Sequence, residues 1–78
     1  MTQPVAPNQV NEALDFVRSG KGMLAVITHL RCYQIDKRTL AKFEKAGEWI
    51  LKADGDGYRL RTGKHSVYLF PGQLLMVN

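Results

Sequence analysis

The stretch that decides the fold is Met-Leu-Ala-Val-Ile-Thr-His-Leu-Arg-Cys-Tyr-Gln, residues 23–34. Interpreted as a helix, it forms one apolar stripe with spacings of three and four residues, made of Met23, Val26, Ile27, Leu30 and Tyr33. Interpreted as a strand, it supplies the β-favouring runs Ala-Val-Ile-Thr and Cys-Tyr, with apolar side chains on both faces. The periodicity fits both interpretations, and each of them leads to a different fold.

The segments on either side of this stretch are better defined. Residues 8–18 carry apolar side chains on one helical face and end at a Ser-Gly-Lys-Gly turn, which predicts a helix. A second helix is expected from Lys37 to Ala46, because Asp36 is a natural N-cap and Gly47 can adopt the left-handed conformation that ends a helix. After it, alternation and turn residues predict short strands at residues 49–53, 58–61, 66–70 and 74–77.

Both interpretations of residues 23–34 give an α+β fold, but the architectures differ. With a helix there, three helices precede a C-terminal antiparallel β-hairpin or sheet, which is the order of a small winged-helix-like domain. With a strand there, the segment joins an antiparallel sheet of about four or five strands, with two helices packed on one face. Residues 1–7 are expected to form a flexible N-terminal lead-in, and residues 8–78 a single globular domain.

The charge balance favours a polyanionic partner. The net charge is +4, and from residue 36 onward eight Lys and Arg residues stand against five Asp and Glu residues. Duplex DNA and an acidic protein are the partners that such a balance indicates. The single cysteine excludes an internal disulfide and fits the reducing cytoplasm. No apolar run approaches the roughly 20 residues needed to cross a bilayer, so no membrane partner is expected.

Three short segments carry a resemblance to a known family: Asp-Lys-Arg-Thr-Leu at residues 36–40, Glu-Lys-Ala-Gly at 44–47 and Gly-Tyr-Arg-Leu at 57–60. They resemble the recognition helix and the wing of winged-helix DNA-binding domains, over residues 36–61. The resemblance implies that helix 37–46 enters the major groove and that the 58–65 hairpin contacts the duplex. The DNA-binding residues that it implies are Arg38, Thr39, Lys42, Lys45, Arg59, Arg61, Lys64 and His65.

The resemblance also implies a role for each of these side chains. Those of Arg38, Thr39 and Lys42 would lie nearest the base edges, and the other cations would lie on phosphates. His65 would gain charge only below about neutral pH. The function implied is a small basic regulatory or accessory protein that binds duplex DNA, of phage or plasmid origin.

The strand interpretation favours a different function, a non-enzymatic protein-interaction module or inhibitor with an acidic partner. The stretch from Tyr58 to Val77 resembles the ends of some small phage-encoded anti-CRISPR proteins, which implies a role against host defence. Neither function is enzymatic, because no constellation of acid, base and nucleophile is visible. A homodimer would add core to so small a domain, and the sequence leaves the oligomeric state open.

No cofactor or metal site is expected. His29 and Cys32 are three residues apart, but structural zinc needs four ligands and the other histidine, His65, is distant in the sequence. Cys32 is expected to be a buried, inert thiol. Trp49 follows the predicted end of the second helix and is expected either to anchor the core, which is favoured, or to be an exposed aromatic at a partner interface.

Overall fold

The decisive stretch forms a β-hairpin in the computed structural model. Strand β2 (Met23–Ile27) pairs antiparallel with β3 (Cys32–Ile35). Thr28 closes the turn between them, because its N–H donates to the Arg31 carbonyl (2.9 Å) and its hydroxyl oxygen accepts from the Arg31 N–H (3.0 Å). Leu30, which the helical stripe would bury, is 80% exposed in this turn. The helical interpretation of residues 23–34 is therefore wrong, and so is the winged-helix order that depended on it.

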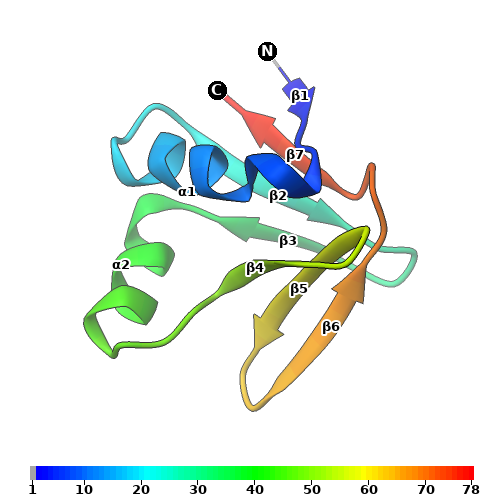
Figure 1. The fold of residues 1–78 in the computed structure, drawn as a ribbon. Helices are drawn as coiled ribbons and strands as arrows, with labels where there is room; N and C mark the ends of the chain where they lie inside the picture. Colours follow the sequence, from blue (N-terminus) through cyan, green and yellow to red (C-terminus); the bar gives the residue numbers. More distant parts are fainter. Residues whose placement is uncertain (1) are drawn as a thin grey trace.

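The structure describes residues 2–78, and within them the fold is α+β, as predicted (Figure 1). The remaining elements, in chain order, are β1 (Thr2–Pro4), the 3-10 helix η1 (Pro7–Gln9), α1 (Val10–Arg18), α2 (Lys37–Lys45), β4 (Leu51–Asp54), β5 (Gly57–Thr62), β6 (His65–Leu69) and β7 (Leu74–Val77). The two α-helices and the four C-terminal strands lie close to the ranges expected from the sequence.

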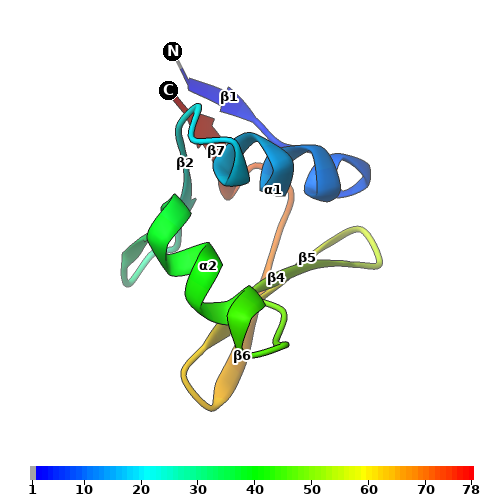
Figure 2. The same ribbon diagram turned by 90° about the vertical axis from the view of Figure 1, so that its left-hand side faces the viewer.

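The strand interpretation is confirmed, since residues 23–34 join a four-stranded antiparallel sheet that includes the C-terminal strand β7. The other three described strands form a second antiparallel sheet, which the sequence did not separate from the first. One has the order β1-β7-β2-β3 and the other the order β4-β5-β6. Helix α1 packs against β2 of the first sheet, against β4 of the second, and against α2. Figure 2, in which α2 lies toward the viewer, shows α1 above α2 and the β4–β5 hairpin below α1. The polypeptide therefore surrounds one core from several sides.

Residues 2–5 are not the flexible lead-in that was expected. Thr2, Gln3 and Pro4 pair in register with β7, and the N–H of Val5 donates to the Leu74 carbonyl at 3.0 Å. Val5 is only 2% exposed. The segment is ordered because β7 offers it a strand edge and the core accepts the Val5 side chain, neither of which is visible in the local sequence.

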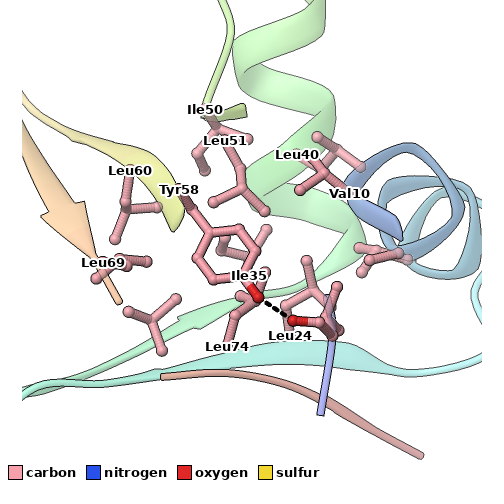
Figure 3. Packing of buried hydrophobic residues seen from close by; sticks show 14 residues of the cluster. Val10, Leu24, Ile35, Leu40, Ile50, Leu51, Tyr58, Leu60, Leu69 and Leu74 are labelled. Carbon is pink, nitrogen blue, oxygen red and sulfur yellow. Dashed lines mark hydrogen bonds between the residues drawn. The ribbon is translucent and has the colours of Figure 1, made fainter. Parts of the chain in front are cut away.

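Tyr58 occupies the centre of the core (Figure 3). Its side chain is fully buried, and its hydroxyl donates to the backbone carbonyl of Val5. Burial raises the pKa of the Tyr58 phenol. The buried residues around it come from both sheets and both helices: Val5, Val10, Ala13, Val17, Leu24, Val26, Ile35, Leu40, Ile50, Leu51, Leu60, Leu69 and Leu74.

Replacing Tyr58 with Phe should lower the free energy of unfolding by about 1–3 kcal/mol, because the buried Val5 carbonyl would lose its partner from the phenol. Urea unfolding measures this change. Tyr68→Phe is the matched control, since Tyr68 is 37% exposed, and its effect should stay within about 0.5 kcal/mol. Equal effects of the two substitutions would contradict the proposed role of the Tyr58 hydroxyl.

Helix α2 is fixed at both ends by polar contacts. The Asp36 carboxylate accepts the Thr39 N–H at 2.7 Å, which confirms the predicted N-cap and lowers the pKa of Asp36. Gly47 follows the helix with a φ of 71°, as expected for the residue that ends it. Near that end, the Glu44 carboxylate accepts from the Arg18 guanidinium of α1, which lowers the pKa of Glu44.

These two carboxylates should make the fold acid-sensitive. Because both pKa values are lowered on folding, the stabilisation is present above the ordinary values of 3.8 and 4.5 and is lost as the pH falls through the folded-state values. Urea unfolding at several pH values between about 7 and 3 should show this loss. Asp36→Asn keeps a capping oxygen that cannot titrate, so this variant should lose less stability in acid than the wild type. An identical pH dependence in the two proteins would contradict the role given to Asp36.

Candidate functional site

The cations of α2 lie on the side of the helix that faces away from the core. Arg38, Lys42 and Lys45 are exposed, whereas Leu40 on the opposite side is 3% exposed. Within residues 2–78 none of these three cations forms an ion pair, as expected for a surface that could meet a polyanion. Thr39 is different, because its backbone N–H is held by the Asp36 cap and the residue lines a hollow beside β5.

The two arginines of β5 point outward, as the alternation predicted, but carboxylates occupy both. Arg59 Nε lies 2.9 Å from Asp54 Oδ2, across the β4–β5 turn. Arg61 Nη1 lies 2.6 Å from Glu48 Oε2, just before β4. Charge that is neutralised in this way contributes less to phosphate binding, since the ion pair must be broken or shared when DNA binds.

Lys64 and His65 are exposed at the β5–β6 turn, where they line an open hollow of about 370 Å³ together with Trp49 and Arg61. Trp49 is half-buried rather than a core anchor. Its ring lies 4.6 Å from Arg61 Cζ and 4.5 Å from Lys52 Nζ. The indole therefore holds cations on the outer side of the sheet. The structure brings Arg61, Lys64 and His65 together around this hollow, and Arg38, Lys42 and Lys45 are not among the described residues that line it.

A second surface, which we call the apolar patch, consists of Leu30, Tyr68 and Phe70. These side chains are 80%, 37% and 65% exposed, respectively. All three line one hollow of about 310 Å³ between the β2–β3 turn and β6. The Tyr68 and Phe70 rings meet edge to face, with their centroids 5.3 Å apart. Exposed apolar groups that gather around one concavity mark an interaction surface more strongly than scattered ones do.

The hollow beside the apolar patch continues past Tyr33. A second hollow, of about 290 Å³, is lined by Tyr33 of β3, by Phe43 of α2 and by Leu60 of β5. Tyr33 lines both, and we call the two hollows together the inter-sheet groove. Arg31 and Arg61 are among its lining residues, and none of the described residues that line it is a carboxylate. The groove is therefore apolar with a basic border.

Sequence reasoning missed the apolar patch because it assigned Leu30 to a helical stripe. Two signals were available. In the strand interpretation, Leu30 falls at a turn, where an apolar side chain has no core to enter. Phe70 directly precedes Pro71, which marks the end of a strand, and strand ends lie at the margin of a core. Cys32, expected to be buried, is exposed on β3.

Comparison of the chain with protein-family models, with curated proteins and with solved structures finds no match, so the functional argument rests on its own residues. Among residues 2–78, no cluster of three or more His, Cys, Asp or Glu side chains is placed to hold a metal ion. No helix in this described part of the chain has the length and apolarity to cross a membrane.

Arg61 should stabilise the outer side of the sheet through Glu48 and Trp49. Arg61→Ala is expected to lower the free energy of unfolding by about 0.5–1 kcal/mol and to make the Trp49 fluorescence more accessible to acrylamide. Trp49 is the only tryptophan, so the signal is specific. Lys64→Ala is the matched control, because Lys64 lines the same hollow without lying over the indole. If both variants quench like the wild type, the Arg61–Trp49 contact does not persist in solution.

Proposed function

We propose that this protein is a non-enzymatic protein-interaction module that binds its partner through the apolar patch and the inter-sheet groove. The observation that carries the proposal is the gathering of Leu30, Tyr68 and Phe70, all exposed, around one hollow. Transferring such side chains from water to a partner releases about 25 cal/mol for each Å² of apolar surface. Aromatic side chains and arginine beside a pocket are the composition of interface hot spots, and Arg31 lines the same hollow.

The charges around the groove favour an acidic partner. Arg31 and His29 line the hollow at the apolar patch, and Arg61 lines the hollow near α2. Arg61 is already paired with Glu48, whereas Arg31 forms no ion pair among the described residues. Because no described residue that lines the groove is a carboxylate, an incoming basic or neutral segment would leave the Arg31 charge without a complement. An acidic and apolar segment would satisfy both features of the groove.

Duplex DNA remains the rival partner, and the α2 cations are what favours it. The ion pairs of Arg59 and Arg61 weigh against it, because they occupy two of the four cations expected on phosphates. The apolar patch also has no role in the DNA-binding arrangement. These two observations support a protein partner over duplex DNA.

A selection experiment tests the proposal. The protein is immobilised and presented with a displayed library of random peptides about 12 residues long, enough to span a strand or three helical turns. The affinity of enriched peptides is then measured for the wild type and for the double variant Leu30→Ser, Phe70→Ser. We expect the double variant to bind at least about tenfold more weakly, because two exposed apolar contacts are lost.

The matched control is Lys42→Ser, Lys45→Ser, which changes two exposed residues of α2 outside the groove and should bind the enriched peptides with unchanged affinity. Thermal unfolding verifies that both double variants are folded. A random-sequence DNA duplex is titrated with the same three proteins at several salt concentrations. The proposal is overturned if no enriched peptide distinguishes the patch variant from the wild type. It is also overturned if tight, strongly salt-dependent DNA binding is lost only in the lysine variant.

A further inference from the structure

We propose that the partner segment is an extended peptide that pairs with the open edge of β6 and extends the β4-β5-β6 sheet by one strand. This inference rests on the proposed function, since it specifies how a partner occupies the groove. In Figure 1, β6 is the outermost strand of its sheet, and it leads toward the β2–β3 turn. The apolar patch lies where these two segments meet.

Hydrogen bonding shows which backbone groups of β6 face outward. The N–H of Arg61 donates to the Ile50 carbonyl at 2.8 Å, so the backbone of Arg61 faces β4. In an antiparallel ladder the facing alternates along the strand, so the neighbouring residues Leu60 and Thr62 face β6. Their register partners are Val67 and His65. The backbone groups of Ser66 and Tyr68, which alternate with these, are therefore directed away from β5.

The edge of β6 lacks the devices that usually block strand addition. Proteins protect exposed edges with proline and with charged side chains, lysine above all. Among the described edge strands, β1 contains Pro4, and β4 contains Lys52 and Asp54. In contrast, β6 reads His-Ser-Val-Tyr-Leu and β3 reads Cys-Tyr-Gln-Ile. The two edges without proline, lysine or acid are the two that supply residues to the inter-sheet groove.

The edge of β6 rather than that of β3 carries the apolar patch. Tyr68 belongs to β6 and Phe70 follows it directly. The N–H of Phe70 is already satisfied by Oε1 of Gln73 at 2.7 Å, so pairing with a partner would end at Tyr68. The open stretch is therefore short and lies beside the hollow of about 310 Å³. Backbone pairing there would supply affinity, and the hollow would select the side chains.

The surroundings of this edge specify the chemistry of the peptide. Alternate side chains of an added strand point to opposite faces of the sheet. One set would meet the hollow lined by Leu30, Tyr33 and Val67, and should be apolar. The other set would lie on the face that carries Ser66 and Tyr68. Arg31 lines the hollow and no described lining residue is a carboxylate, so the peptide should also carry Asp or Glu beside the hollow. A second copy of this chain fits less well, because its net charge of +4 would repel a basic groove.

Proline substitution at the edge tests strand pairing with a peptide enriched in the selection above. Ser66→Pro removes an N–H that faces away from the sheet, a position where edge strands tolerate proline. Ala53→Pro is the matched control on the opposite edge of the sheet. Because the backbone of Ile50 is hydrogen-bonded to Arg61 of β5 and the facing alternates along the strand, Lys52 and Asp54 face β5 and the N–H of Ala53 faces outward. We expect Ser66→Pro to weaken peptide binding at least about tenfold and Ala53→Pro to leave the affinity unchanged.

Amide hydrogen exchange of the wild-type complex gives a second measurement that needs no variant. The amides of Ser66 and Tyr68 should become protected when the peptide binds, and the enriched peptides should contain both apolar and acidic residues. Unchanged exchange at both amides would overturn strand pairing. If Ser66→Pro binds normally while Leu30→Ser, Phe70→Ser does not, the groove stands as the binding surface and strand pairing is wrong. Sedimentation that shows two copies of this chain pairing through β6 would also overturn it.

Discussion

The hydrogen bond from the Tyr58 hydroxyl to the Val5 carbonyl joins the two sheets at the centre of the core. Tyr58 belongs to β5, the middle strand of one sheet, and Val5 follows β1 at the edge of the other. A buried phenol needs a partner, and Val5 supplies it only when the N-terminal strand is paired with β7. This contact therefore links the position of residues 2–5 to the orientation of β5.

The orientation of β5 in turn determines which side chains form the candidate binding surfaces. With Tyr58 and Leu60 turned inward, the arginines between them must lie on the outer side, where Asp54 and Glu48 are within reach. The three-stranded sheet ends at β6, and the hairpin of β2 and β3 ends at a turn that carries Leu30. The groove between them is apolar because the nearest cations of β5 are directed toward their carboxylates. The ion pairs and the apolar patch are thus consequences of one strand orientation.

Local signals predicted the parts of the fold that local chemistry controls. Asp36 and Gly47 marked the ends of α2, and the alternation in residues 58–61 gave the inward and outward faces of β5. Residues 23–34 could not be assigned, because the same apolar positions satisfy a helical stripe and a two-faced strand. In the structure the chain turns at Thr28 and forms a hairpin. The strand conformation of residues 23–27 depends on pairing with β7, which is distant in the sequence. The pairing of residues 2–4 could not be predicted either, because it also depends on β7, at the other end of the sequence.

The features of the candidate site that depend on local sequence were predicted, and those that depend on tertiary packing were not. The exposure of Arg38, Lys42 and Lys45 follows from helical periodicity and was predicted, whereas the ion pairs of β5 depend on strand register and were not. The groove needs the packing of two sheets, which no local pattern encodes. Sequence reasoning therefore found the charge but not the apolar surface.

In the proposed function, the exposed cations near the groove and the apolar patch would have complementary roles in recognising an acidic partner. Cations on the rim of an interface act mainly on the rate of encounter, because long-range attraction steers the partner before contact. Apolar side chains act mainly on the lifetime of the complex, because their burial is lost only on dissociation. Arg31 beside the groove and Lys64 of the β5–β6 turn can contribute to the rate of encounter in this way. On this view the excess of positive charge, which first suggested DNA, accelerates the binding of a protein segment that the groove then retains.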